Sequence, residues 1–261
     1  MLTLFIQRLP LHIFSRPMRV IRSRTLAKLF IYTLFCLLIS PQITQAAPSG
    51  RGRVQIDDTY YEVTWSDGDS FRITAGRLRG QRVRLLGYNT LESYGPVHKW
   101  GDWNEWELYK IAKNAKEVAI SDTWECRSLA IKDRYSRLLV RCPQLIEAML
   151  TSGMGHLFEV EEKPDVRLLM LQADAIKRKV GMWSKGAPEG LMTSIHSQDE
   201  DPKQPAYNRV ASLETGLAQK QLHSNKYKVC EWVCSQGSCL LYVPFQRRYG
   251  DDRPECLRWK R

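Results

Sequence analysis

The chain has 261 residues, which allows one substantial hydrophobic core with an appendage, or two small domains. Its composition is ordinary for a folded protein, with 43% hydrophobic and 26% charged residues. The formal net charge is +11, but six of the 39 basic residues lie in the first 46 positions, where no acidic residue occurs. The remaining 33 basic and 28 acidic residues leave a charge of +5, which excludes a polycation and says little about nucleic acid.

The first 46 residues have the three-part pattern of a secretory signal peptide. Basic residues from Arg8 to Lys28 precede an apolar run of eleven residues, Leu29–Ile39, and small residues follow before Ala47. Eleven residues are too few to span a bilayer comfortably. The pattern therefore predicts a signal peptide at 1–46 and export to the periplasm or the outside, with an uncleaved membrane anchor as the alternative.

The next part of the chain, 47–186, predicts a small barrel with helices. Short alternating stretches between turn residues are typical of half-buried strands, and they occur at Arg53–Ile56, Tyr60–Trp65, Ser70–Thr74, Gln81–Leu86, Trp124–Ile131 and Arg137–Cys142. Apolar residues at helical spacing predict helices at Glu105–Ala119, Gln144–Thr151 and Val166–Val180. Short strands with helices inserted late favour a mainly β, α+β class, namely a five-stranded OB-like barrel with three helices.

The remaining residues differ in composition from the predicted barrel. Residues 187–225 are rich in Ser, Gln, Pro, Gly and charge, which predicts a polar linker. Residues 226–261 form a Cys-rich C-terminal segment that is too small to hold a core without cross-links.

Six cysteines remain when Cys36, inside the apolar run of the signal, is set aside: Cys126, Cys142, Cys230, Cys234, Cys239 and Cys256. An even number in an oxidising compartment predicts disulfides. The alternative is a metal site formed by the last four, although their spacing does not match the common zinc patterns. If a hairpin turns about Arg134, residues whose numbers sum to 268 face each other, so Cys126 and Cys142 are placed to form a bridge.

Three polar clusters accompany the predicted strands: Asp67-Gly68-Asp69-Ser70-Phe71, Val83-Arg84-Leu85-Leu86-Gly87-Tyr88-Asn89-Thr90-Leu91-Glu92, and Asp133-Arg134-Tyr135-Ser136-Arg137-Leu138. In order and spacing they resemble the staphylococcal nuclease (thermonuclease) family. The resemblance continues to Gly181-Met182-Trp183-Ser184 and covers about residues 51–186. Each cluster alone is common, whereas three in register are fairly specific.

Hydrolysis of a phosphodiester requires that charge growing on the phosphoryl oxygens is stabilised and that a water is activated. Arginine suits the first task because its planar cation binds phosphate oxygens in pairs. Strand alternation turns Arg84 away from its apolar neighbours. The resemblance implies that Arg84 and Arg137 bind the phosphate and that Glu92 activates or orients the water. It also implies that Tyr135 touches the bound nucleotide, with Arg134 beside it as a further substrate-binding candidate.

The resemblance implies a Ca²⁺ cofactor, held by Asp69, Asn89 and the carbonyl oxygen of Thr90. These are oxygen ligands of the kind that calcium prefers. At position 89 the family has an aspartate, so the amide of Asn89 leaves one negative charge missing. We therefore expect weaker calcium binding or a shifted metal preference.

A second departure from the family concerns the nucleotide. Glu159 and Glu161 stand where the family has two tyrosines near the base, and a carboxylate cannot stack on a base. Trp100 and Trp103 are candidates to replace that platform, although core packing is the simpler interpretation of both.

The resulting expectation is an exported, calcium-dependent enzyme that cuts DNA or RNA within the chain with low sequence specificity. We expect a monomer without a stable protein partner. One alternative is a nucleic-acid-binding module that has lost turnover, and another is an envelope interaction protein in which the Cys-rich tail is the functional part. If the enzyme interpretation holds, activity is expected to survive deletion of residues 187–261.

Overall fold

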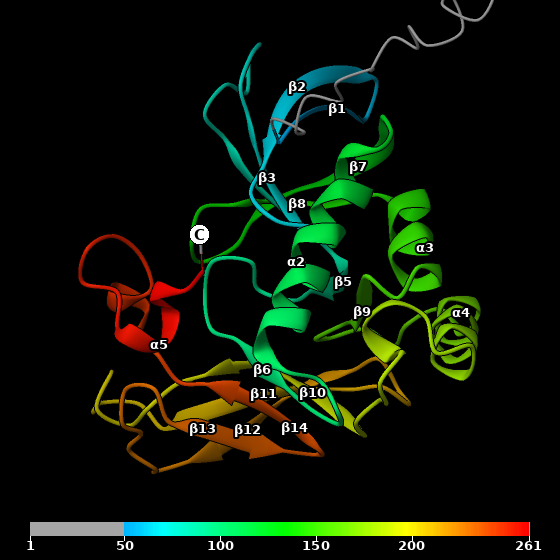
Figure 1. Ribbon diagram of the computed structural model, residues 1–261. Coiled ribbons are helices and arrows are strands. Elements are labelled where there is room, and N and C mark those ends of the chain that lie inside the picture. The colour runs from blue at the N-terminus through cyan, green and yellow to red at the C-terminus, as the bar shows by residue number, and fades with distance from the viewer. Residues whose placement is uncertain (1–49, 261) are drawn as a thin grey trace, which may run out of the picture. The chain divides into compact units, whose positions relative to one another are not determined.

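The computed structural model describes residues 50–260, which belong to one compact unit (Figure 1). The predicted signal peptide, residues 1–46, lies outside the described residues and stays a prediction. Within the described part of the chain, no helix has the length and apolar character needed to cross a membrane.

Six strands form a closed barrel in the order β1-β2-β3-β4-β8-β7. They are β1 (Arg51–Ile56), β2 (Thr59–Trp65), β3 (Ser70–Ile73), β4 (Arg82–Leu85), β7 (Trp124–Lys132) and β8 (Leu138–Arg141). Neighbours are antiparallel except for β1 with β7 and β4 with β8, whose parallel pairing closes the barrel. The predicted OB-like class is confirmed, but with six strands where five were expected. The six strands correspond to the six alternating stretches of the sequence: Asp57, at a φ of 53°, turns the chain between β1 and β2, and β1 also pairs with β7 and so belongs to the barrel.

Three helices accompany the barrel, close to their predicted positions: α2 (Glu105–Ile120), α3 (Pro143–Thr151) and α4 (Val166–Lys177). Helix α2 begins at a capping box in which Asn104 and Glu107 bind each other's backbone N–H groups. Gly68 fixes how closely the helix approaches the turn before β3. A Cβ there would lie 2.9 Å from the Cβ of Ala115 and 2.7 Å from the methyl carbon of Thr90. A glycine is therefore required where the turn, α2 and β5 meet.

Two short strands outside the barrel extend the region that carries the polar clusters. Strand β5 (Gly87–Thr90) pairs with β9 (Gly155–Phe158) and places Asn89 opposite His156. In the sequence, His156 and His98 have no catalytic spacing, which favours surface positions, yet both are buried, at 0% and 3% exposure. Each lies on a short strand that pairs with one other strand, so that His156 faces Asn89 of β5 and His98 faces Leu240 of β14.

Residues 187–225 form a three-stranded sheet and not the predicted polar linker. The strands are β10 (Gly190–Ile195), β11 (Ala206–Ser212) and β12 (Ala218–His223), all antiparallel. The prediction failed because one face of this sheet is buried and the other is not. Leu191, Met192 and Val210 lie in the interior at 3% exposure or less. The other face and the turn at 201–205 are polar, so the composition of the whole stretch is polar. The alternation of buried and exposed residues along each strand is therefore not recognised from composition.

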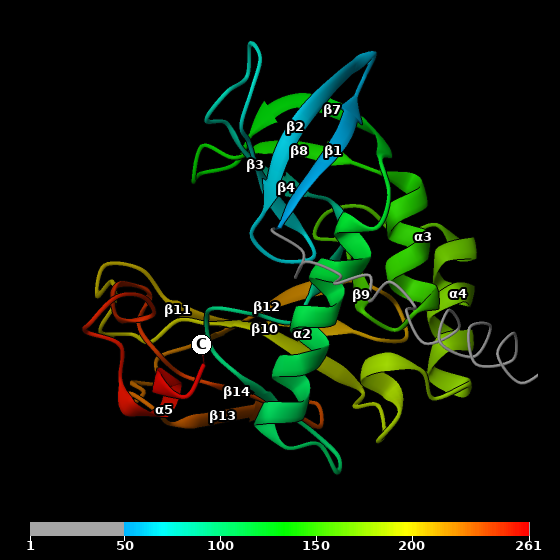
Figure 2. The same ribbon diagram turned by 45° about the horizontal axis from the view of Figure 1, so that its top comes forward.

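A second sheet joins the Cys-rich segment to the barrel half, residues 50–186. Its order is β13 (Trp232–Ser235), β14 (Ser238–Leu241) and β6 (His98–Lys99). Strand β6 lies just before α2 in the chain and pairs with β14. This pairing joins residues 98–99 and 238–241 in one sheet. Figure 2 shows the barrel strands on one side of α2 and the C-terminal strands on the other.

Within residues 50–260, three disulfides are formed: Cys126–Cys142, Cys230–Cys256 and Cys234–Cys239. The first joins β7 to the end of β8, as the predicted register requires, because Ser128 faces Val140 in the same hairpin. The last four cysteines form disulfides, so the alternative of a metal site from these residues is not what the structure contains. Cys230–Cys256 attaches the short helix α5 (Glu255–Arg258) to the segment before β13.

Candidate active site

The site begins at the turn between β2 and β3, where Asp67 and Asp69 lie. An Asp67 carboxylate oxygen accepts hydrogen bonds from the Asp69 N–H (3.2 Å) and the Ser70 hydroxyl (2.7 Å), so this side chain holds the turn together. The Tyr88 hydroxyl donates to the Gly68 carbonyl (2.6 Å) and ties the turn to β5. Asp69 is 4% exposed and points toward β4 and β5.

The Asp69 carboxylate gathers residues from β4 and β5. One oxygen accepts from the Thr90 N–H (2.9 Å) and the Thr90 hydroxyl (3.2 Å). The other forms an ion pair with Arg84, whose second terminal nitrogen donates to the Asn89 side-chain oxygen. The pairing of Ser70 with Arg84 across β3 and β4 brings the arginine to this point. Four residues singled out in the sequence therefore meet in one buried cluster.

Glu92 lies in the loop after β5, half-buried beside this cluster. Burial raises the pKa of its carboxyl, and the negative charge of Asp69 raises it further. Arg248 and Lys260, both from the C-terminal segment, act in the opposite direction. The charge environment of Glu92 is thus set partly by residues more than 150 positions away in the sequence.

The cluster carries more negative than positive charge. Burial, followed by the charges of Asp69 and Glu92, raises the pKa of Asp67 to about 8. Arg84 opposes this shift but does not remove it. Such an excess fits an oxygen-binding cation, since a bound cation would neutralise the carboxylates. Among residues 50–260, no group of three or more His, Cys, Asp or Glu side chains is arranged to hold a metal ion.

Arg137 belongs to a neighbouring group on the turn between β7 and β8. Its Nε forms an ion pair with Asp133 (2.7 Å), and Asp133 also accepts from the N–H groups of Tyr135 and Arg137 (both 2.9 Å). Buried Val83 and buried Leu138 are partners across β4 and β8, so alternation turns Arg84 and Arg137 to the same outer side of this strand pair. Their side chains lie on one face without touching in the described contacts.

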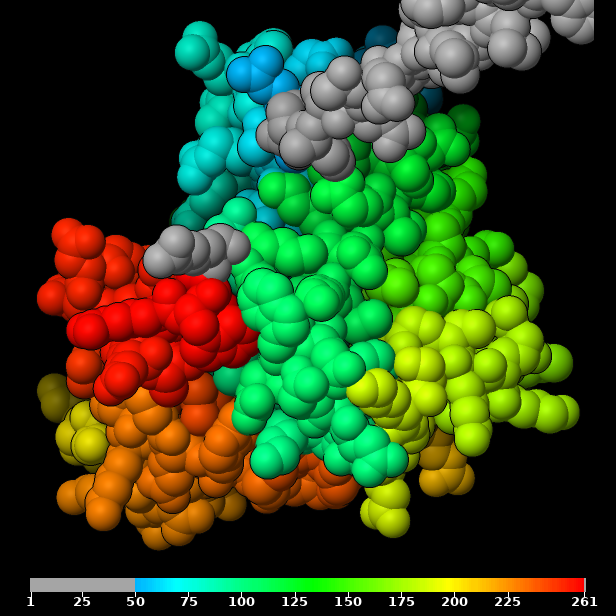
Figure 3. Space-filling model, viewed as in Figure 1, coloured from blue at the N-terminus to red at the C-terminus, as the bar shows by residue number. Residues whose placement is uncertain are grey.

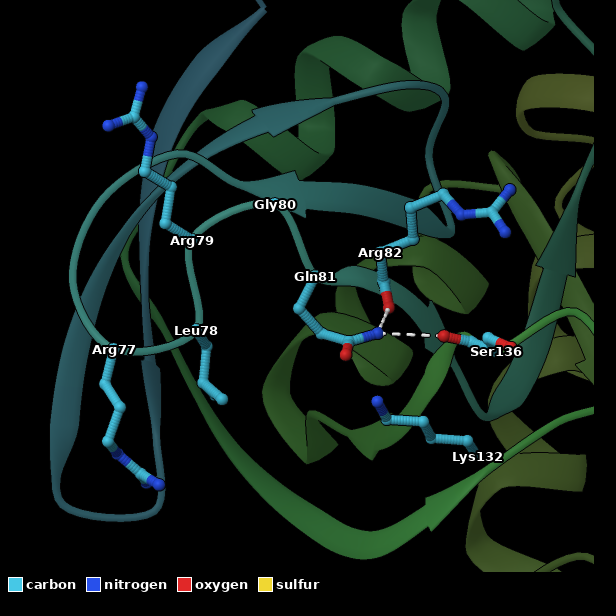
Figure 4. A pocket seen from close by; sticks show the side chains of 8 residues that line it. All are labelled: Arg77, Leu78, Arg79, Gly80, Gln81, Arg82, Lys132 and Ser136. Atoms are coloured by element: carbon cyan, nitrogen blue, oxygen red, sulfur yellow. Dashed lines mark hydrogen bonds between the residues drawn. The ribbon is translucent and has the colours of Figure 1, made fainter.

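A shallow basic depression adjoins this turn (Figure 4). It is lined by Arg77, Leu78, Arg79, Gly80, Gln81, Arg82, Lys132 and Ser136, with no acidic residue among them. The Gln81 amide donates to the carbonyl oxygens of Arg82 (2.7 Å) and Ser136 (2.9 Å), which joins the loop after β3 to the β7–β8 turn. Figure 4 shows Arg79 and Arg82 turned away from the hollow, and the Arg82 guanidinium donates to the Tyr135 carbonyl (2.6 Å).

The residues at which the sequence departs from the family near the expected base have other contacts in the structure. Trp100 and Trp103 are 3% and 8% exposed, and their ring N–H groups donate to the carbonyls of Gly186 and Met182, so neither can stack on a base. Glu159 forms an ion pair with Arg141 (2.8 Å). Its charge is therefore compensated within the protein.

Sequence reasoning missed a contact from the far end of the chain. Lys260 is 2% exposed, and its ammonium donates to the backbone carbonyls of Gly95 (2.8 Å), Glu92 (3.1 Å) and Pro96 (3.4 Å). Burial lowers the pKa of Lys260 to about 7. No local pattern could have indicated this residue, because its partners lie about 165 positions earlier.

The OB-like barrel thus carries an arginine–carboxylate cluster on one side. Residues 82–185 match the family model described as staphylococcal nuclease homologue, which agrees with the OB-like barrel of this part of the chain. The matched region includes Arg84, Glu92 and Arg137 but ends before the C-terminal sheets. A comparison with curated proteins finds no match.

Proposed function

We propose that the protein is an exported, Ca²⁺-dependent nuclease that hydrolyses phosphodiester bonds of DNA or RNA with low sequence specificity. The observation that carries this proposal is the buried cluster in which Asp69 holds Arg84 and Thr90 while Glu92 stands beside it. In such a cluster the arginine can bind the phosphate of the substrate, and the partly neutralised carboxylates can bind the cation that accompanies it.

In this proposal the two arginines stabilise the phosphoryl group. A guanidinium has five N–H donors, so the contacts of Arg84 with Asp69 and Asn89 leave donors for phosphate oxygens. These contacts also fix the planar group before substrate arrives, which is the arrangement that favours transition-state stabilisation. Arg137 is oriented in the same manner by Asp133.

Glu92 is proposed to orient the attacking water and to accept its proton. Its raised pKa makes the carboxylate a stronger base than an exposed glutamate. Asp69, Asn89 and the Thr90 carbonyl would hold the calcium ion, with Asp67 fixing the turn that carries Asp69. When bound, the ion would supply positive charge next to the phosphoryl oxygens.

The proposal is tested with the purified mature protein by release of acid-soluble nucleotides from DNA and from RNA. Calcium is titrated, and a chelator serves as the control. We expect Arg84→Ala and Glu92→Gln each to lower kcat by about two to three orders of magnitude, as loss of a preorganised charge or base does. The matched controls are Arg127→Ala and Glu62→Gln, which alter exposed residues of β7 and β2. Full activity in the first pair would refute the site.

A second function is favoured by one observation, the neutral Asn89 in the cluster. A nucleic-acid-binding protein that has lost turnover would bind single-stranded or duplex probes in a salt-dependent way. It would release no nucleotides at any calcium concentration. The same assay, run beside a binding measurement, distinguishes the two functions.

A further inference from the structure

One arginine of the barrel lies against two tyrosines that come from different parts of the chain. The Arg134 guanidinium donates to the hydroxyl of Tyr135, its neighbour in the β7–β8 turn, at 2.6 Å. The same nitrogen lies 3.4 Å from the hydroxyl of Tyr207, on β11 of the C-terminal sheet. The turn that carries Arg137 is therefore joined to a sheet that the family match does not include.

Strand pairing gives the β11–β12 face around Tyr207 a mixed aromatic and basic character. Arg209 lies two residues beyond Tyr207 on β11 and opposite Lys220 on β12. The Lys220 ammonium lies 4.5 Å and the Arg209 guanidinium 5.8 Å from the centre of the Tyr207 ring, and the His196 ring packs against it with 4.3 Å between ring centres. The intervening Asn208 is buried, at 8% exposure, so alternation directs this set to the other, open side of the sheet.

The cationic and aromatic groups continue without a break toward the proposed active site. The Arg137 guanidinium lies 5.4 Å from the Tyr135 ring centre, and the Arg134 guanidinium lies 4.8 Å from the same ring. We define the Tyr207 surface as Arg134, Tyr135, Tyr207, Arg209 and Lys220. Its three cations outnumber the neighbouring carboxylate of Asp133, which is already paired with Arg137 at 2.7 Å, so the charge of the surface is complementary to a phosphate backbone.

We propose that the Tyr207 surface binds a single-stranded segment of the nucleic-acid substrate next to the cleaved phosphodiester. Tyr135, 47% exposed, offers a face on which an unpaired base stacks, and a base reaches Tyr207 by displacing the Lys220 side chain from its ring while His196 stays against it. The flanking cations meet the phosphates. In a duplex the bases are stacked on each other and cannot reach the rings, so single strands are preferred. This inference rests on the proposed function for the choice of substrate, but binding can be measured without cleavage.

The test is binding of a fluorescein-labelled single-stranded thymidine 12-mer, measured by anisotropy in chelator over a range of salt concentrations. We expect Tyr207→Ala to weaken binding about tenfold, the usual effect of losing one base-stacking ring. Lys220→Ala should reduce the slope of log affinity against log salt by about one. Tyr60→Ala is the matched control, because Tyr60 is 59% exposed and carries Arg53 at 5.2 Å from its ring centre, on the β1–β2 hairpin.

Equal losses in Tyr207→Ala and Tyr60→Ala would overturn the inference, as would tighter binding of the duplex form. Tyr207→Phe separates stacking from folding, because it keeps the ring and should retain most of the affinity. If the wild-type protein binds the 12-mer as expected but releases no nucleotides with calcium, the proposed function fails and this inference stands. If it cleaves while Tyr207→Ala binds normally, the proposed function stands and this inference fails.

A different observation carries a second inference, about the loop of Glu92. Residues 91–97, between β5 and β6, belong to no strand, and their carbonyl groups at 92, 95 and 96 accept from the buried Lys260 ammonium. A buried ammonium requires acceptors, and buried carbonyls require donors, so the contact satisfies both. Figure 1 shows the red C-terminal segment beside this loop, and the contacts place Lys260 in it.

The C-terminal segment holds Lys260 firmly. The Lys260 carbonyl accepts from Arg253 (3.1 Å), and the neighbouring Trp259 ring lies 5.5 Å from Tyr109 on α2. The Cys230–Cys256 disulfide anchors α5 immediately before this point. Figure 3 shows the red C-terminal residues packed against the green helix α2.

We infer that Lys260 is a positioning residue, which holds the Glu92 loop in the conformation that hydrolysis requires. The variants are Lys260→Met and Lys260→Arg, with Arg258→Met as the matched control at an exposed position of α5. We expect Lys260→Met to lower kcat about tenfold or more, with KM within about twofold, because misplacement of a catalytic group affects the chemical step. Lys260→Arg should recover part of the loss.

Amide hydrogen exchange over residues 92–97 gives a readout that does not depend on activity. Lys260→Met should speed exchange in this loop while strand β2 stays as protected as in the wild type. An unchanged loop, or an acceleration spread evenly over the whole chain, would contradict a positioning role. If the protein proves inactive, the exchange result still decides whether Lys260 holds the loop, so failure of the proposed function remains distinguishable.

Discussion

The barrel half, residues 50–186, and the C-terminal region, residues 187–260, contribute to the candidate site in different ways. Every catalytic and metal-binding candidate lies in the barrel half, within three short stretches of sequence. The C-terminal region offers no such stretch, yet Lys260 reaches the Glu92 loop and Tyr207 reaches Arg134. The barrel half carries the residues suited to the reaction, and the C-terminal region supplies contacts around them.

This difference changes one expectation drawn from the sequence. A polar linker and a small cross-linked tail would be dispensable, so deletion of residues 187–261 was expected to spare activity. The sheet β13-β14-β6 uses a strand from the barrel half, and the Glu92 loop loses three hydrogen bonds without Lys260. We now expect the deletion to abolish activity.

The largest contrast between the two halves is expected for arginine and lysine substitutions. Arg137→Ala should lower kcat by about two orders of magnitude, because Arg137 is proposed to stabilise the transition state. Lys220→Ala should leave kcat within about twofold and raise KM, since Lys220 is proposed to act only in binding. Steady-state kinetics on one single-stranded substrate measures both. A similar fall of kcat in the two variants would erase the distinction.

The disulfides allow the two halves to be compared at similar cost to stability. Cys126–Cys142 and Cys230–Cys256 join residues 16 and 26 positions apart. Removing either pair by serine substitution should lower the free energy of unfolding by about 3 kcal/mol in the chain-entropy account. Only Cys230→Ser with Cys256→Ser should also lower kcat, because it releases α5 and with it Lys260. Urea unfolding and kcat measured on both double variants test this difference.

A smaller effect is expected within the barrel half, at Asn89. Asn89→Asp adds a carboxylate to the proposed calcium site without a large change in shape. The half-saturating calcium concentration should fall by roughly tenfold, since an anionic oxygen binds a hard cation more strongly than an amide. Isothermal titration with calcium gives the same quantity independently of turnover. Unchanged binding would mean that residue 89 is not a ligand.

The barrel and its site could be largely predicted from the sequence because their signals are local. The order apolar, basic, apolar at Val83, Arg84 and Leu85 already indicates which side of β4 faces the core. The C-terminal sheets could not be recognised in this way. Asn208 and Val210 are buried beside Tyr207 and Arg209, so β11 appears polar in composition although one face is interior. The contacts of Lys260 depend on three-dimensional folding, which no spacing in the sequence records.

The smallest effect expected here concerns pH at the junction of the two halves. His98 lies on β6, opposite Leu240 of β14, and burial lowers its pKa to about 3. The nearby His156 and Lys260 act in the same direction. An unfolded histidine has a pKa of about 6.5, so as pH falls below this value the unfolded state takes up a proton that the folded state refuses.

The contribution of a neutral His98 to stability is therefore complete above about pH 6.5 and is lost progressively toward pH 3. Between pH 7 and pH 5 the loss should approach about 2 kcal/mol, since each pH unit below the unfolded pKa costs at most about 1.4 kcal/mol. Glutamine does not titrate, so His98→Gln should not lose this contribution. In urea unfolding, its free energy of unfolding should rise relative to that of the wild type by about 2 kcal/mol as the pH falls from 7 to 5. If the difference in stability between the variant and the wild type stays constant with pH, the pKa of His98 is the same in the folded and unfolded states. Protonation of His98 at the β6–β14 junction would then not contribute to acid unfolding.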